Sequence, residues 1–125
     1  MILADTSVWV DHLRKNDARM DRLLNRQQIL MHPFIIGEIA LGHLRNRQVI
    51  LKSLWELPSV STANDGEVLS FIEAHSLFGS GIGYLDAHLL ASLKVSGSAR
   101  FWTRDRKLGA AAASLGLKVG EQLTW

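Results

Sequence analysis

The chain has 125 residues, of which 47% are apolar and 21% charged, with 14 Lys and Arg against 12 Asp and Glu and no cysteine. This length predicts one domain with a substantial core, and the apolar fraction argues against disorder. The absence of cysteine excludes a disulfide scaffold, a thiolate zinc site and a cysteine nucleophile.

The predicted elements alternate between short apolar runs and helical segments. The expected strands are, in chain order, 2–4, 29–31, 59–61, 100–103 and 117–119. The expected helices are 8–14, 18–26, 33–47, 49–57, 64–76, 85–95 and 107–115. Such alternation predicts an α/β fold with a mostly parallel sheet. No apolar run approaches the ~20 residues that span a bilayer, and no signal peptide opens the chain, so we expect a cytoplasmic protein without a membrane segment.

Two aspartates follow predicted strands. Asp5 comes directly after the first apolar run, and Asp105 follows Phe101-Trp102-Thr103. Ligands of parallel sheets bind outside the carboxyl ends of the strands, so both aspartates are candidates for chemistry. The alternative is that each one is the N-cap of the next helix.

Two further acids lie on predicted helices among apolar residues. Glu38 has Phe34 and Leu41 as helical neighbours, so we expect it on the core-facing side, where a carboxylate needs a metal or a basic partner. Asp86 has Leu89 and Leu90 as helical neighbours. Its alternative role is to stabilise the first turn of its helix through the helix dipole.

Four carboxylates in one place cannot all stay ionised without protons or cations among them. Oxygen ligands without cysteine favour Mg²⁺ or Mn²⁺ over zinc. Such ions activate water and hold phosphate oxygens. Without these four acids, the remaining residues carry a clear excess of positive charge. This excess is suited to binding a polyanion, or it consists only of arginine side chains in contact with solvent.

The motifs around the four acids resemble those of PIN-domain ribonucleases, and specifically the VapC-type toxins of toxin–antitoxin pairs. The matching segments are ILADTSVWVDHLR at the start, the Glu38 helix, GYLDAHLLAS and FWTRDRKL. The resemblance implies a PIN-like three-layer fold and a single nuclease domain over residues 1–125. It also implies Mg²⁺ or Mn²⁺, a homodimer and a small cognate antitoxin.

The resemblance assigns roles to individual residues. Asp5, Glu38, Asp86 and Asp105 match the acidic quartet, which implies catalysis and metal binding, while Thr103 and Thr6 are supporting hydroxyls. The expected function is that of an endoribonuclease toxin that cleaves RNA with a metal-activated water, and the resemblance makes tRNA a candidate substrate. This mechanism leaves 5′-phosphate and 3′-hydroxyl ends. The basic residues beside Asp105 contact RNA phosphates or form a solvated helix start; they are Arg104, Arg106 and Lys107.

The alternative function is a non-catalytic PIN-like module that binds protein or RNA and keeps the acids for structure.

His88 is expected to point away from Asp86, and the glycine-rich segment 78–83 is expected to form a lip beside Asp86. We expect Trp9, Trp55 and Trp102 to lie in the core or in an interface. Trp125 is expected to make a partner contact or to form a tail. Four residues form either core or an apolar surface patch: Leu51, Leu54, Trp55 and Phe71.

Overall fold

The computed structural model describes residues 1–120, so the expectation for Trp125 lies outside the described residues. Its sheet has three parallel strands, β1 (Ile2–Ala4), β2 (Ile29–Leu30) and β3 (Arg100–Trp102), in the order β2-β1-β3. Three of the five short apolar runs therefore form the strands that the sequence predicts. The central strand β1 is fully buried, as expected for a strand covered on both faces.

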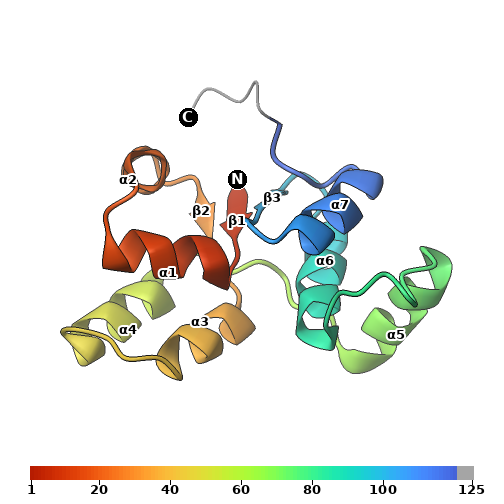
Figure 1. The fold of residues 1–125 in the computed structure, drawn as a ribbon, viewed down its shortest axis with the longest axis horizontal. Coiled ribbons are helices and arrows are strands. Elements are labelled where there is room, and N and C mark those ends of the chain that lie inside the picture. Colours follow the sequence, from red (N-terminus) through yellow and green to blue (C-terminus); the bar gives the residue numbers. More distant parts are fainter. Residues whose placement is uncertain (121–125) are drawn as a thin grey trace.

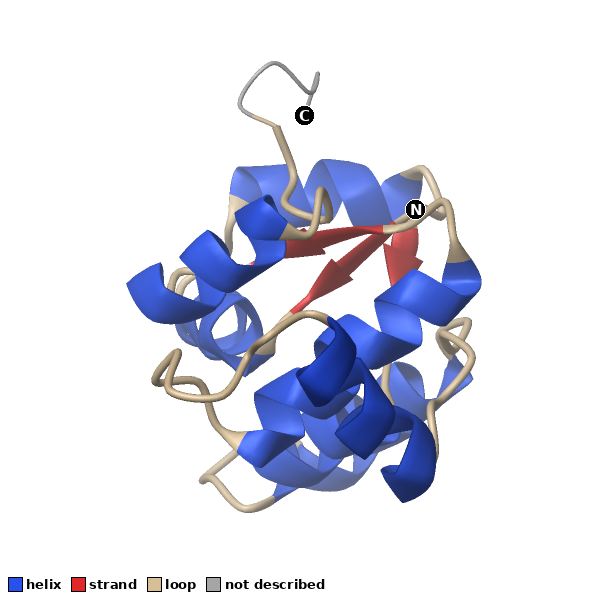
Figure 2. Ribbon diagram, turned by 90° about the vertical axis from the view of Figure 1, so that its right-hand side faces the viewer, coloured by secondary structure: helices blue, strands red, loops and turns tan. Residues whose placement is uncertain are grey.

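Helices cover the sheet on both sides (Figures 1 and 2), which confirms the α/β fold with a parallel sheet. In Figure 1, α1 to α4 lie on one side of β1, and α5 to α7 lie on the other. The helices are α1 (Thr6–Arg14), α2 (Ala18–Asn25), α3 (Pro33–Ala40), α4 (Arg47–Glu56), α5 (Asp65–Ala74), α6 (Tyr84–Ser96) and α7 (Arg106–Ser114). None of the helices described is long and apolar enough to cross a membrane.

Two of the predicted strands are reduced to single bridges. Ser59 pairs only with Met31, and Lys118 pairs only with Phe101. The first pairing cannot continue, because His32 directly follows Met31 and caps α3 by accepting the Phe34 N–H at 3.0 Å. The prediction of regular strands at 59–61 and 117–119 is therefore wrong.

The predicted helix 33–47 is also wrong in length, since α3 ends at Ala40. The guanidinium of Arg47 donates to the carbonyls of Ala40 and Gly42, and Asn46 adopts a left-handed conformation before α4 begins. Free carbonyls at a helix end need such donors. The chain between the two helices is thus an ordered turn rather than a continuation of the helix.

The core forms around β1, β3 and α6, whose residues 87–93 are all buried. Trp9 and Trp102 lie in this core, as do Leu54 and Phe71. Trp55 instead is 69% exposed. The proposed apolar surface patch is therefore mostly interior, with Trp55 as its exposed member.

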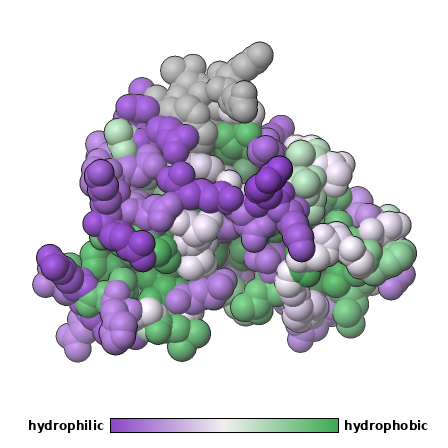
Figure 3. All heavy atoms as spheres, in the orientation of Figure 1, coloured by the Kyte–Doolittle hydropathy of each residue, from purple (hydrophilic) through white to green (hydrophobic). Residues whose placement is uncertain are grey.

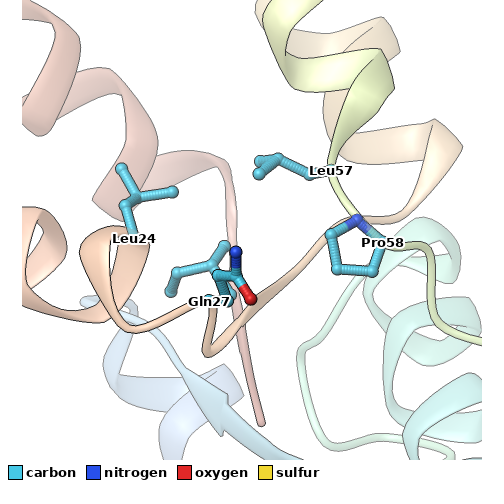
Figure 4. A pocket seen from close by; sticks show the side chains of 5 residues that line it. Leu24, Gln27, Leu57 and Pro58 are labelled. Atoms are coloured by element: carbon cyan, nitrogen blue, oxygen red, sulfur yellow. The ribbon is translucent and has the colours of Figure 1, made fainter.

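An apolar cavity of about 360 Å³ lies beside the edge strand β2 (Figure 4). Its walls are Leu24, Gln27, Ile29, Leu57 and Pro58. It contains no titratable side chain, so it offers no chemistry of its own.

Candidate functional site

The site begins where β1 and β3 end side by side. Ala4 is paired with Trp102 in the parallel register, and the Asp5 N–H donates to the Trp102 carbonyl at 3.0 Å. The next residues along the two strands are Asp5 and Thr103. Their adjacency is a direct result of strand pairing, and the Thr103 hydroxyl donates to Asp5 Oδ2.

Asp5 is only 5% exposed, and both of its carboxylate oxygens accept hydrogen bonds. Oδ1 accepts from the Ser7 hydroxyl at 2.5 Å and from the Val8 N–H at 3.3 Å. The Val8 contact makes Asp5 the N-cap of α1, which was the alternative to a functional role. Capping and site position coexist here, because the cap lies at the carboxyl end of the central strand.

Asp105 is placed by the same hydroxyl. Its N–H donates to Thr103 Oγ1 at 3.0 Å, and its Oδ1 caps α7 by accepting the Leu108 N–H at 3.0 Å. Thr103 therefore joins the two strand-end aspartates: it donates to one and accepts from the backbone of the other.

Asp86 approaches from the first turn of α6. Its Oδ2 accepts the Gly83 N–H at 3.3 Å, so the glycine-rich segment does end beside it. Partial burial raises the pKa of Asp86, the Gly83 hydrogen bond opposes this, and the charges of Asp5 and Asp105 raise the pKa further. Three aspartates from different elements thus lie within electrostatic reach of one another.

Glu38 completes the group from α3, but its predicted burial is wrong. Ile35 and Ile39 form the buried face of α3, while Glu38 flanks that face and is exposed to solvent. Partial enclosure of its carboxyl nevertheless raises its pKa, the Thr6 hydroxyl opposes the rise, and the charges of Asp86 and Asp5 add to it. The buried Thr6 Oγ1 has no partner of regular hydrogen-bond geometry within the described residues.

A divalent cation fits the chemistry of these donors. The four carboxylates and the hydroxyls of Thr6 and Thr103 are hard oxygen ligands, and no histidine is among them. Burial raises the pKa values of Glu38 and Asp86 first, and the mutual repulsion that adds to this effect is what a cation would relieve. Yet no group of three or more acidic or histidine side chains in residues 1–120 is already arranged to hold a metal ion. The match is thus one of donor type and charge rather than of preformed coordination.

Basic residues beside Asp105 divide into two kinds. Arg104 is tied to two carboxylates, with Nε 2.7 Å from Asp11 Oδ2 and Nη2 3.0 Å from Asp17 Oδ2. Arg106 and Lys107 are exposed in the first turn of α7. Hydrophilic side chains gather across the middle of the face in Figure 3, between the two groups of helices.

A cleft of about 650 Å³ adjoins Glu38 between α1, α3 and α4. Its floor is apolar, and three of its lining residues carry or can carry positive charge: Arg14, His43 and Arg45. The sequence patterns did not single out this cleft, because Arg14 is far from His43 and Arg45 along the chain.

His88 is separate from the acidic group, as expected. It is 4% exposed, its Nε2 lies 3.0 Å from Asp65 Oδ1, and the Tyr84 hydroxyl donates to the same oxygen at 2.9 Å. Ser7 was the residue that sequence reasoning passed over. Its position in the capping triplet Asp5-Thr6-Ser7 was the available signal, and its hydroxyl contacts both Asp5 and the Arg104 N–H.

A parallel sheet whose strand ends bring together acids from four elements is the arrangement found in PIN domains. The PIN domain family profile matches residues 2–114, and the chain belongs to this family. Ribonuclease VapC32 of Mycobacterium tuberculosis, from strains CDC 1551 and H37Rv, is 43% identical over 124 residues. The alignment covers 99% of this chain and 100% of that relative.

Proposed function

We propose that this protein is a metal-dependent endoribonuclease and the toxin of a type II toxin–antitoxin pair. The observation that carries the proposal is the grouping of Asp5, Asp86, Asp105 and Glu38 at the carboxyl edge of the sheet. Their coupled charges call for a counter-ion, and similarity to a ribonuclease over nearly the whole chain supports RNA as the substrate. We further propose that residues 1–125 form one nuclease domain.

Mg²⁺ or Mn²⁺ is the proposed cofactor, held by Asp5, Asp86, Asp105 and Glu38. When bound, such an ion lowers the pKa of a coordinated water and offsets negative charge on a phosphodiester. Thr103 keeps Asp5 and the Asp105 backbone in place, and Ser7 fixes the other oxygen of Asp5. Asp5 and Asp86 would hold the ion directly, while Asp105 and Glu38 would hold it directly or through water, or would orient the attacking water.

Exposed cations near the acids supply the attraction for RNA. Arg106 and Lys107 lie in the turn after Asp105, and the cleft beside Glu38 carries further positive charge at Arg14 and Arg45. We propose that the protein acts in the cytoplasm as a homodimer. Its partner is a small antitoxin, and its substrate class includes structured RNAs such as tRNA.

The test is cleavage of RNA by the purified protein with Mg²⁺ or Mn²⁺ and with a chelator. We expect cleavage only with the metal, products with 5′-phosphate and 3′-hydroxyl ends, and loss of at least 100-fold in Asp5→Asn, which keeps the capping oxygen. Glu73→Gln, an exposed acid on α5, is the matched control and retains activity. A 2′,3′-cyclic phosphate product would contradict the mechanism.

A second candidate function is a non-catalytic binding module. The observation in its favour is that three of the acids accept helix-start N–H groups, while the described residues contain no preformed metal site. Under this function, RNA or protein is bound but RNA stays intact with every divalent ion. The cleavage experiment therefore separates the two functions directly.

A further inference from the structure

The loop between β3 and α7 carries two residues of the candidate site, Thr103 and Asp105, with Arg104 between them. The Thr103 hydroxyl donates to Asp5 at the end of β1, and the Asp105 N–H donates to that hydroxyl, but the Arg104 side chain extends to α1 and the start of α2. Its guanidinium is only 2.7 Å from Asp11 and 3.0 Å from Asp17. A guanidinium bound by two carboxylates is held in a defined orientation, since its donors form a rigid fork.

Of the two carboxylates, that of Asp17 is well anchored, whereas the Asp11 side chain is 50% exposed. Asp17 has a side chain only 15% exposed and caps α2 by accepting the N–H groups of Arg19 and Met20. Arg19 also pairs with Asp17 at 3.4 Å and stacks over the ring of Trp102, the last residue of β3. Arg104 is therefore attached to elements that are packed against the same strand as the site.

The backbone of Arg104 makes a second connection. Its N–H donates to Ser7 Oγ at 3.2 Å, and that hydroxyl in turn donates to Asp5 Oδ1. The backbone and the side chain together fix the loop to α1 at two points, Ser7 and Asp11. A shift of the loop would move Thr103 and Asp105 with respect to Asp5 at the same time.

We propose that Arg104 is a positioning residue: its ion pairs with Asp11 and Asp17 hold the loop so that Thr103 contacts Asp5 and Asp105 stays bonded to Thr103. This differs from the sequence-based interpretation of Arg104 as a contact for RNA phosphates. With Asp11, Asp17 and Arg19 in the same cluster, the positive charge of Arg104 is balanced and offers little net attraction to a phosphate. The inference rests on the proposed nuclease function for its kinetic readout only.

The experiment compares Arg104→Gln, Arg104→Lys and Asp11→Ala with the wild-type protein. A positioning role predicts that all three variants lose about 10- to 100-fold in kcat, while KM and the salt dependence of RNA binding are unchanged. Lysine does not rescue, because a point charge cannot bridge both carboxylates. Arg22→Gln, on the exposed side of α2, removes the same charge and is the matched control with unchanged kinetics.

Asp11→Ala gives the sharpest distinction. If Arg104 contacted phosphate, removing Asp11 would free the guanidinium and tighten RNA binding. Arg104→Lys would then keep the RNA affinity of the wild-type protein. Arg104→Gln would then raise KM and reduce the salt slope by about one. That pattern would overturn the positioning role.

Hydrogen exchange provides a readout that needs no activity. The amides of Asp105 and Leu108 are bonded to Thr103 Oγ1 and Asp105 Oδ1, so loosening the loop exposes both. We expect faster exchange over residues 103–108 in Arg104→Gln and Asp11→Ala, with a melting temperature close to wild type. Unchanged exchange would refute the inference even if the wild-type protein proved not to cleave RNA, and faster exchange would support it in that case too.

Discussion

At the scale of single residues, three acids of the candidate site also accept hydrogen bonds from N–H groups at helix starts. Asp5 and Asp105 cap α1 and α7, and Asp86 accepts the N–H that precedes α6. Capping holds one carboxylate oxygen in a fixed place. For Asp86 and Asp105, the second oxygen is not used in capping. The pKa of Asp86 is raised first by burial and then by the charges of Asp5 and Asp105.

We predict that Asp86→Asn stabilises the metal-free protein at pH 7 and abolishes activity. The folded-state pKa of Asp86 lies above its ordinary value of 3.8, so the stability contributed by this group is fully present below that value. It is lost as the pH rises through the folded pKa, and asparagine removes the loss while keeping an acceptor for Gly83. Melting curves should show a gain of a few degrees at pH 7 and none at pH 3.

The control for this prediction is Glu73→Gln, which lies outside the group and should leave the melting temperature unchanged at both pH values. A lower melting temperature for Asp86→Asn at pH 7 would mean that its carboxylate is stabilising, against the direction of its pKa shift.

At the same scale, we predict that the Thr103 hydroxyl contributes to both stability and activity. Thr103→Val removes the donor to buried Asp5 and the acceptor for the Asp105 N–H, which should lower the free energy of unfolding by about 1–3 kcal/mol. Activity should fall by about tenfold or more, because both aspartates lose a positioning contact. Thr103→Ser keeps the hydroxyl and should restore most of both quantities in urea unfolding and cleavage assays. Equal stability of the valine and serine variants would remove the hydroxyl from this role.

At the scale of elements, the glycine-rich segment before α6 packs against α7. Gly81 has a φ of +85°, and a Cβ there would lie 2.9 Å from Lys107 Cδ and 3.2 Å from Nζ. Gly79 has a φ of +74° but nothing within 4 Å of the corresponding position. Substitution of Gly79 therefore tests backbone strain alone, whereas substitution of Gly81 tests backbone strain together with the contact to Lys107.

We predict that Gly79→Ala lowers the free energy of unfolding by about 1 kcal/mol, the strain of a positive φ. Gly81→Ala carries the same strain and also displaces the flexible end of the exposed Lys107 side chain, so it should be about equally destabilising but should also raise KM for RNA. Paired urea titrations and kinetics test this. Identical effects of both substitutions would mean that the Lys107 contact has no consequence.

At the scale of the whole molecule, a buried polar network links α3, α6 and the chain before α5. His32 is 2% exposed, its Nε2 lies 3.4 Å from Ser92 Oγ, and that oxygen accepts the Ala63 N–H at 3.0 Å. Burial, followed by the nearby charge of His88, lowers the pKa of His32 to about 4. The core is therefore built around a neutral histidine.

We predict that His32 makes the fold sensitive to acid. Its pKa falls from 6.5 to about 4 on folding, so its stability contribution is fully present above 6.5 and is lost as the pH falls toward 4. His32→Asn keeps a capping acceptor for Phe34 and removes the titration. Unfolding free energies measured from pH 7 to pH 4 should fall less steeply for the variant. Parallel curves for the two proteins would contradict the prediction.

The sequence by itself determined the strand-end aspartates and the parallel sheet. Asp5, Thr103 and Asp105 follow apolar runs, and the carboxyl ends of parallel strands must meet at one edge, so local pattern was sufficient. Asp86 was found in the same way, from a charge among leucines at helical spacing. Most helix starts were also clear, because capping residues and Pro33 mark them locally. The start of α4 at Arg47 was not, because Asn46 makes no side-chain cap there.

Only the tertiary structure decided the rest, because it depends on contacts between distant segments. Helical spacing could not tell that Glu38 flanks the buried face formed by Ile35 and Ile39, since that depends on how α3 is rotated against its neighbours. The partners of Arg104 lie 87 residues away or more along the chain, and no local pattern pairs them. A sequence names the charged groups, but the free energy of a charge depends on the distances and burial that folding sets.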